Sequence, residues 1–147
     1  MKFIFLMVFL VTLKAFGACP DLSGHYIYNP DGYIPVTFEI TQRSCEHLDF
    51  LLKAPTVGFR DTRSINPNGV FATLKVDDHE KVEGSYKFEG DVLLFTETIL
   101  PKDGSAPYTN TGSYFFSSSK TLMNNYEMVR SQQHSKFSFL FVRAGAL

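Results

Sequence analysis

Apolar and polar residues alternate along most of this chain, and this pattern constrains the fold more than any other feature. Val36, Phe38 and Ile40, for example, occupy every second position, with Thr or Glu between them. A period of two is typical of an antiparallel strand with one buried and one exposed face. No segment shows a sustained period of 3.6 residues, which would indicate an amphipathic helix. The sequence therefore predicts an all-β protein.

Turn-forming residues separate the alternating segments. Clusters of Asn, Pro, Asp and Gly, residues that favour turns, occur at 29–32, 66–69 and 89–91. The spacing gives eight to ten strands, and a sheet of that size closes on itself or splits in two. We therefore expect an antiparallel up-and-down β-barrel of eight to ten strands, with a β-sandwich as the alternative. The segment 53–68 alternates least and is the expected mouth loop or lid, with room for one short strand.

The first 17 residues have the parts of a secretory signal peptide. Lys2 precedes an apolar run that ends at Leu13, and the small residues Ala15 and Gly17 suit cleavage after Gly17. The alternative is a retained membrane anchor, but the run is shorter than the roughly 20 apolar residues that a spanning helix needs. The sequence predicts a periplasmic or secreted protein with a single domain, residues 18–147.

The charge of the predicted mature chain argues against nucleic acid as a partner. The leader contains two of the 14 basic residues, so 12 remain against 15 acidic residues, a net charge of −3. The remaining basic residues are scattered and form no stripe that would bind a phosphate backbone or an anionic membrane surface. All seven tyrosines and most of the 15 phenylalanines follow the leader. That aromatic content is ample for a packed β core.

The two cysteines are expected to form a disulfide. Cys19 and Cys45 both follow the predicted cleavage site, and an exported protein meets an oxidising compartment. The alternative is a lipoprotein with an acylated Cys19, because residues 16–18 resemble the small-residue motif that precedes a lipidated cysteine. Only in that case do we expect a membrane as a partner.

The first strand suggests a family. Gly24-His25-Tyr26 resembles the Gly-x-Trp pattern that opens the barrel in lipocalin-like (calycin) proteins, with Tyr26 at the Trp position. In those families a basic residue of the last strand packs across this ring and closes the base of the barrel. The resemblance implies that role for Arg143, together with Gly24 and Tyr26. An ordinary ring–guanidinium contact in another β fold is the alternative.

We find no pattern that indicates a cofactor, a metal or an enzyme. The four histidines are far apart and none lies in a zinc-type motif. The acidic cluster at 77–80 has the groups to hold a divalent cation, but a solvated hairpin turn explains it without a ligand. No Gly-x-Ser-x-Gly nucleophile motif occurs, and the cysteines are expected to be bonded to each other.

Two binding functions follow from the predicted barrel. An eight-stranded barrel has room for side chains or one small ligand. If large inward side chains line an open cavity, the protein is a lipocalin-like carrier of a small apolar molecule. The residues expected to bind this ligand are Phe38, Phe50, Tyr86, Phe88 and Phe139, and other candidates for the inward face are Ile40, Leu52, Val70 and Leu74.

The second function is an interaction module. If side chains fill the barrel, the protein would bind a secreted protein or a cell-envelope component through its loops. The residues expected to make those contacts are Phe59, Arg60, Arg63 and Tyr108, from the segments 53–68 and 101–110. The alternation gives two faces for each strand without showing which is inward, so the sequence leaves both functions open.

Overall fold

The computed structural model of the protein describes residues 19–29 and 35–145. The predicted leader and most of the predicted turn at 29–32 lie outside these ranges. The described residues form ten strands and one short 3₁₀ turn, so the predicted all-β fold is confirmed. The strands are β1 (Gly24–Tyr28), β2 (Val36–Ser44), β3 (His47–Ala54), β4 (Phe59–Ile65), β5 (Ala72–Val76), β6 (Glu80–Glu89), β7 (Val92–Pro101), β8 (Tyr108–Ser118), β9 (Thr121–Arg130) and β10 (Gln133–Arg143), and the 3₁₀ turn is η1 (Pro55–Val57).

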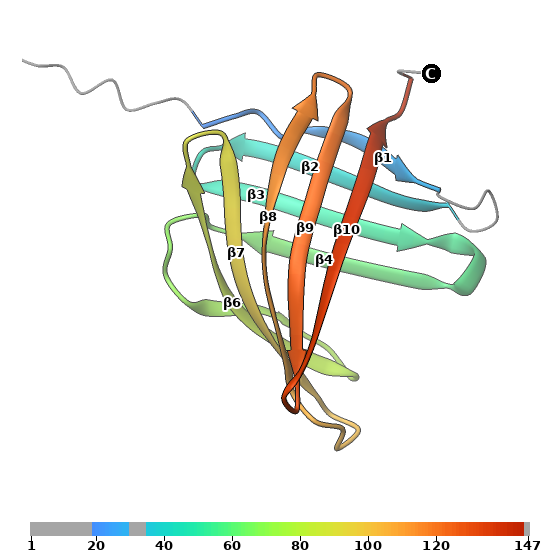
Figure 1. The fold of residues 1–147 in the computed structure, drawn as a ribbon, viewed down its shortest axis with the longest axis vertical. Helices are drawn as coiled ribbons and strands as arrows, with labels where there is room; N and C mark the ends of the chain where they lie inside the picture. Colours follow the sequence, from blue (N-terminus) through green and yellow to red (C-terminus); the bar gives the residue numbers. More distant parts are fainter. Residues whose placement is uncertain (1–18, 30–34, 146–147) are drawn as a thin grey trace, which may run out of the picture.

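The ten strands form one antiparallel meander. Each strand pairs with the next along the chain except at one place, and β10 returns to pair with β1, which gives the order β4-β3-β2-β1-β10-β9-β8-β7-β6-β5. The end strands β4 and β5 therefore face each other across an open seam. The result is a nearly closed barrel, in which β1 to β4 run across the long strands β7 to β10 (Figure 1). The predicted up-and-down barrel is confirmed, with ten strands.

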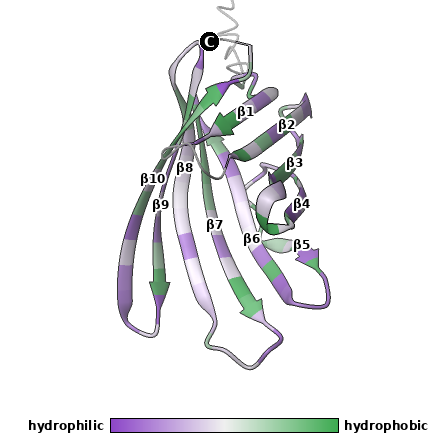
Figure 2. Cartoon of the chain, turned by 90° about the vertical axis from the view of Figure 1, so that its right-hand side faces the viewer, coloured by the Kyte–Doolittle hydropathy of each residue, from purple (hydrophilic) through white to green (hydrophobic). Residues whose placement is uncertain are grey.

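The core follows from the alternation. Hydrophobic and hydrophilic residues alternate along the strands, so that one face of each strand is available for the interior (Figure 2). Aromatic rings fill much of that interior, and the Phe38 ring meets the Phe50 ring edge to face at 5.1 Å. Such edge contacts between rings add to the stabilisation that burial supplies. The buried core comprises Leu22, Tyr26, Phe38, Ile40, Leu48, Phe50, Ile65, Tyr86, Leu93, Phe95, Leu122 and Phe141.

The seam between β1 and β10 is closed around Tyr26. This residue is fully buried, and its hydroxyl donates to the Leu22 carbonyl oxygen at 2.8 Å. The Arg143 guanidinium lies 5.7 Å from the centre of the Tyr26 ring, and its Nη2 donates to the Ser23 carbonyl oxygen at 2.6 Å. A Cβ atom at Gly24 would lie 3.0 Å from the Tyr26 ring and 3.1 Å from Arg143 Nε. A side chain at this position would therefore push Tyr26 or Arg143 aside by a few tenths of an ångström, so glycine favours their close packing.

The expected disulfide is present. Cys19 and Cys45 are bonded, which ties the segment before β1 to the turn between β2 and β3. The Sγ atom of Cys19 is used in this bond and is therefore not free for lipid attachment.

Two expectations about the strands need correction. The segment 53–68 is not one irregular loop, because most of it belongs to the end of β3, to η1 and to β4. Val70 is not on the inward face, because β5 begins only at Ala72 and the Val70 side chain is 62% exposed. Within the described ranges, no helix has the length and apolar character to span a membrane.

Candidate ligand-binding cavity

The barrel contains a cavity of about 320 Å³ that is partly open to solvent. It lies between the two halves of the sheet, and most of its wall is aromatic. The aromatic residues that line it are Tyr28, Phe38, Phe50, Phe59, Tyr86, Phe95, Tyr114, Tyr126, Phe139 and Phe141, and the other lining residues are Val36, Leu52, Ala54, Asp61, Arg63, Glu97, Asn110 and Asn124.

The aromatic wall is continuous because its rings contact one another. Tyr86 stacks on Phe95 at 5.5 Å between ring centres, and Phe95 lies 5.3 Å from Tyr114. Tyr126 and Phe139 stack at 5.9 Å on the neighbouring strands β9 and β10. A ligand in the cavity would therefore meet ring faces, which carry the negative part of the aromatic quadrupole, as well as ring edges.

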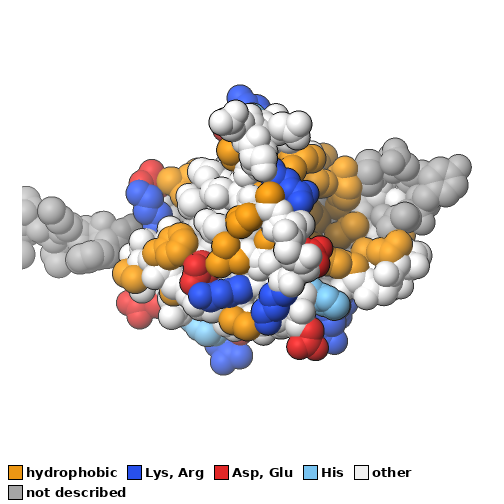
Figure 3. Space-filling model, turned by 90° about the horizontal axis from the view of Figure 1, so that it is seen from below, with side chains coloured by type: hydrophobic (Ala, Val, Ile, Leu, Met, Phe, Trp, Pro, Cys, Tyr) orange, Lys and Arg blue, Asp and Glu red, His pale blue; other side chains and the backbone are white. Residues whose placement is uncertain are grey.

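The mouth of the cavity lies near the turn between β3 and β4. Phe59 lines the cavity although its side chain is 48% exposed, and Val57 beside it is also exposed. Seen from below, hydrophobic side chains gather toward one side of the molecule around a hollow (Figure 3). The cavity is therefore apolar at its entrance.

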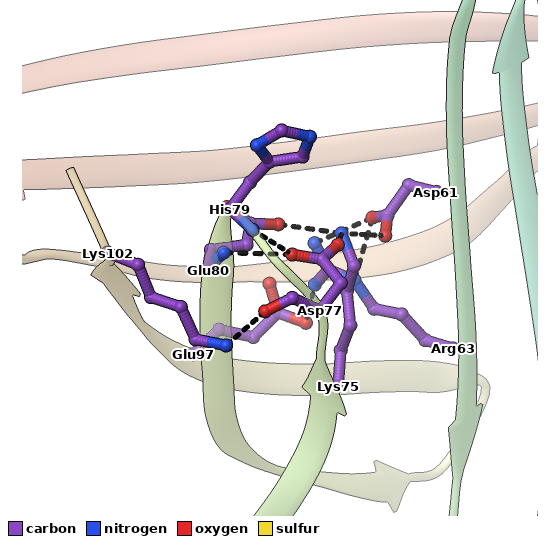
Figure 4. Close-up of polar contacts among 8 residues, drawn as sticks. All are labelled: Asp61, Arg63, Lys75, Asp77, His79, Glu80, Glu97 and Lys102. Carbon is purple, nitrogen blue, oxygen red and sulfur yellow. Dashed lines mark hydrogen bonds and ion pairs between the residues drawn. The ribbon is translucent and has the colours of Figure 1, made fainter.

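The cavity wall also carries a group of polar side chains, two of which follow Phe59 at alternate positions of β4. We call this group the polar cluster: Asp61, Arg63, Tyr86 and Glu97. Arg63 on β4 donates through Nε and Nη2 to Asp61 Oδ2, both at 2.8 Å, and through Nη1 to Glu97 Oε1. The Tyr86 hydroxyl on β6 donates to the same Glu97 oxygen at 2.5 Å. Figure 4 shows Arg63, Asp61 and Glu97 brought together from β4 and β7.

The charge states of the polar cluster follow from burial and from its internal bonds. Burial disfavours the charged guanidinium, but the charge and hydrogen bond of Glu97, together with Tyr86 and Asp61, outweigh this effect, so the pKa of Arg63 lies above its ordinary value. Burial, and then the Glu97 charge, raise the pKa of Tyr86 well above its ordinary value. Arg63 is therefore a permanent cation, and Tyr86 is a neutral hydrogen-bond donor at physiological pH.

Lys75 on β5 connects the open seam to this cluster. Its Nζ lies 3.0 Å from Asp61 Oδ1 on β4, and 2.8 Å from both Asp77 Oδ2 and Glu80 Oε1. Burial disfavours the ammonium charge, but the bonds to Asp77, Glu80 and Asp61 raise the pKa of Lys75 above its ordinary value. The contact between Lys75 and Asp61 joins the two end strands of the sheet by an ion pair (Figure 4).

The acidic turn at 77–80 is organised by bonds within the protein. Asp77 Oδ1 accepts the backbone N–H groups of His79 and Glu80, both at 2.8 Å. The bond to Lys75 and these two N–H groups hold the pKa of Asp77 below its usual range. Across residues 19–29 and 35–145, no group of three or more His, Cys, Asp or Glu side chains is arranged to hold a metal ion.

Two amides add unpaired acceptors to the cavity wall. Asn110 Oδ1 and Asn124 Oδ1 are buried, and neither has a hydrogen-bond donor among the described residues. Asn124 is only 8% exposed. Buried polar atoms are nearly always paired, so two unpaired oxygens in one cavity wall are the kind of exception that a bound molecule or water explains.

The structure places most of the residues expected to bind a ligand at the cavity. Phe38, Phe50, Tyr86 and Phe139 line it. Phe88 packs against the core but is not part of the lining.

The residues expected in contact loops divide between the two faces of β4. Phe59 and Arg63 line the cavity, whereas Arg60 is exposed on the other face. The expectation of an exposed Arg63 is therefore wrong, because the alternation within β4 turns this side chain inward. Tyr108 is not in a loop either, since it is the half-buried first residue of β8.

Sequence reasoning named Arg63 as a loop contact but missed the carboxylates and the asparagines of the site. Glu97 could have been identified from the sequence, because it shares one strand face with Leu93, Phe95 and Ile99. A carboxylate on such an apolar face indicates a buried polar partner. No comparable sequence pattern marks Asp61 or Asn124.

Together these features define a ten-stranded antiparallel barrel with an internal cavity, an aromatic wall and a buried polar cluster. Comparison of the chain with protein-family models, curated protein sequences and solved structures finds no match.

Proposed function

We propose that the protein binds one small molecule, with a largely apolar body, in the cavity of its barrel. The observation that carries this proposal is the cavity itself, about 320 Å³ in volume and lined mainly by aromatic side chains. Small-molecule sites are typically concave, mostly apolar and about 300–1,000 Å³ in volume, with a few polar groups that orient the ligand. The polar cluster supplies such groups.

The proposal includes export and a lipocalin-like relationship but no catalytic step. The leader-like residues 1–17 and the Cys19–Cys45 disulfide support export. The contact of Arg143 with the Tyr26 ring supports the lipocalin-like relationship. Both carboxylates of the polar cluster are bonded to Arg63, an arrangement that suits ligand recognition better than proton transfer.

A fluorescence titration tests this function. Protein expressed from the full chain is titrated with N-phenyl-1-naphthylamine, a neutral apolar probe that fluoresces in apolar surroundings. We expect saturable binding at one site. Ala54→Leu places extra methyl groups in the cavity wall and should weaken binding by about tenfold, roughly 1.4 kcal/mol.

Ala72→Leu makes the same change at an exposed position of β5 and should leave binding unchanged. A wild-type protein that shows no saturable binding would overturn the proposal. Equal weakening in both variants would also overturn it, because the cavity would then not be the binding site.

A second function, contact with a secreted or envelope protein, is favoured by one observation. Val70 and Phe71 are exposed just before β5, and Phe59 is exposed as the first residue of β4, the other end strand of the sheet. Exposed apolar groups of this kind often mark contact surfaces. Replacing Phe59 and Arg60 with alanine should abolish partner capture and leave the fold intact, and unchanged capture would count against this function.

A further inference from the structure

We infer that the cavity prefers a ligand whose head group is a protonated amine over one whose head group is a carboxylate. This inference rests on the proposed function, since it names the chemical class of the molecule that the cavity would bind.

The first argument comes from Glu97. Its side chain is buried, with the residue 3% exposed, and it lines the cavity. The hydrogen bonds that it accepts from Arg63 and Tyr86 both end on Oε1, so neither of these two donors is directed at Oε2. A buried carboxylate oxygen is stabilised by a donor, and more so by a charged one. An ammonium group in the cavity would supply that donor.

The second argument is the balance of charge. Asp61 and Glu97 are the two anions of the cavity lining, and Arg63 is its one cation among the described residues. Arg63 is already bonded to both carboxylates. A ligand carboxylate would therefore have to share this one cation with them, and it would bring a third negative charge to the site.

The nearby lysine does not reverse this balance. Lys75 does not line the cavity, and its ammonium group already contacts Asp61, Asp77 and Glu80. Among the described residues, the extended group therefore contains four carboxylates, on Asp61, Asp77, Glu80 and Glu97, and the two cations that contact these carboxylates are Arg63 and Lys75. Lys102 reaches only the backbone carbonyl oxygen of Asp77. The electrostatic environment beside Glu97 favours a cation.

The third argument is the wall next to the polar cluster. Tyr86, Phe95 and Tyr114 are packed together there, and ring faces attract cations when the site is shielded from water. The unpaired amide oxygens of Asn110 and Asn124 are further acceptors. An arylalkylamine fits this arrangement, with its ammonium group at Glu97 and its ring toward the apolar entrance at Phe59.

Three matched compounds test the inference at pH 7. They are 2-phenylethylamine, a cation; 2-phenylethanol, its neutral counterpart; and 3-phenylpropanoate, an anion of similar size. Their affinities are measured by calorimetry and by displacement of N-phenyl-1-naphthylamine. We expect the amine to bind at least about tenfold more tightly than the alcohol. The carboxylate should bind most weakly of the three.

The outcomes separate this inference from the proposed function. If the alcohol or the carboxylate binds as tightly as the amine, the inference is overturned and the cavity remains a ligand site. If neither the probe nor any of the three compounds binds, the proposed function is overturned, and the inference with it.

A charge-neutralising variant locates the preference. In Glu97→Gln the advantage of the amine over the alcohol should shrink to about twofold, with alcohol binding retained. Glu89→Gln makes the same change at a side chain that is 57% exposed and should keep the full advantage. If the amine keeps its full advantage over the alcohol in a folded Glu97→Gln variant, the inference is overturned. If this variant does not fold, the affinities of the wild-type protein for the three compounds decide the inference.

Discussion

Two tyrosines of the cavity wall, the buried Tyr86 and the half-buried Tyr114, should make the protein less stable at alkaline pH. Burial, together with the Glu97 charge, raises the pKa values of Tyr86 and Tyr114 above the ordinary value for a tyrosine. The folded protein therefore keeps two phenolic protons that the unfolded chain releases near pH 10. Since the folded state then binds more protons, stability must fall as pH rises above that point.

We expect the free energy of unfolding to be nearly constant from pH 8 to 9.5. Above about pH 10 it should decline by about 1.4 kcal/mol per pH unit for each of these tyrosines. Urea titrations at pH 8 to 11 measure this decline, and Tyr114→Phe should make it less steep. A stability that stays flat up to pH 11 in the wild-type protein would contradict the burial of these hydroxyl groups.

At the level of single residues, the sequence identified the apolar part of the site better than its polar part. Phe38 and Phe50 could be predicted because each lies on the apolar face of an alternating strand. The partners of Glu97 could not be predicted, since Arg63 and Tyr86 lie 34 and 11 residues away along the chain. Only the register of the sheet brings these groups together.

Among the strands, β4 shows why alternation alone was insufficient. The inward positions of β4 include Asp61 and Arg63, so its apolar alternation is interrupted where the polar cluster forms. The segment therefore resembled a loop in sequence. By contrast, β2 and β10 carry apolar residues at their inward positions and were predicted as strands. The polar cluster is therefore the reason why β4 could not be predicted from the alternation of its sequence.

The ion pair between Lys75 and Asp61 stabilises the open seam between β4 and β5. The β-sheet ladder does not continue across this seam, and β5 is hydrogen-bonded as a strand only to β6. Lys75→Met would leave the carboxylates of Asp61, Asp77 and Glu80 close together without their shared cation. We expect a loss of about 2 kcal/mol in stability, because Asp61 is buried.

The loss of stability in Lys75→Met should be larger in β5 than in the rest of the barrel. Amide hydrogen exchange in β5 should become faster in Lys75→Met, while exchange in β8 and β9 should change only as much as the overall stability does. Lys81→Met is the matched control, since Lys81 pairs with Glu83 and is more exposed. Equal effects of the two variants on β5 would show that the Lys75 ion pair does not hold the seam.

For the whole molecule, the first and last strands of the chain pair with each other, whereas the two end strands of the sheet stay apart. β1 and β10 are joined by only two registered residue pairs, Tyr26 with Arg143 and Ile27 with Val142. The other seam, between β4 and β5, lies beside the polar cluster. Closure of the barrel, and with it the shape of the cavity, therefore depends strongly on the few contacts between β1 and β10.

Arg143 is the side chain that holds this closure together. Its guanidinium donates to the Ser23 carbonyl oxygen and to the Tyr26 hydroxyl, and it lies over the Tyr26 ring. Arg143→Ala should lower the free energy of unfolding by about 3 kcal/mol, because it removes charged hydrogen bonds and a cation–π contact. It should also weaken binding of N-phenyl-1-naphthylamine, since the cavity lies between the two halves that this seam joins.

Arg143→Lys distinguishes the geometry of the guanidinium from its charge. Lysine keeps the positive charge but cannot stack a planar group on Tyr26 while donating to Ser23, so it should recover less than half of the lost stability. Arg130→Ala, at an exposed position near the end of β9, is the control and should change stability by less than about 0.5 kcal/mol. If Arg143→Ala were as mild as this control, closure would depend on the backbone pairing and the disulfide alone, and Tyr26 with Arg143 would have no special part in it.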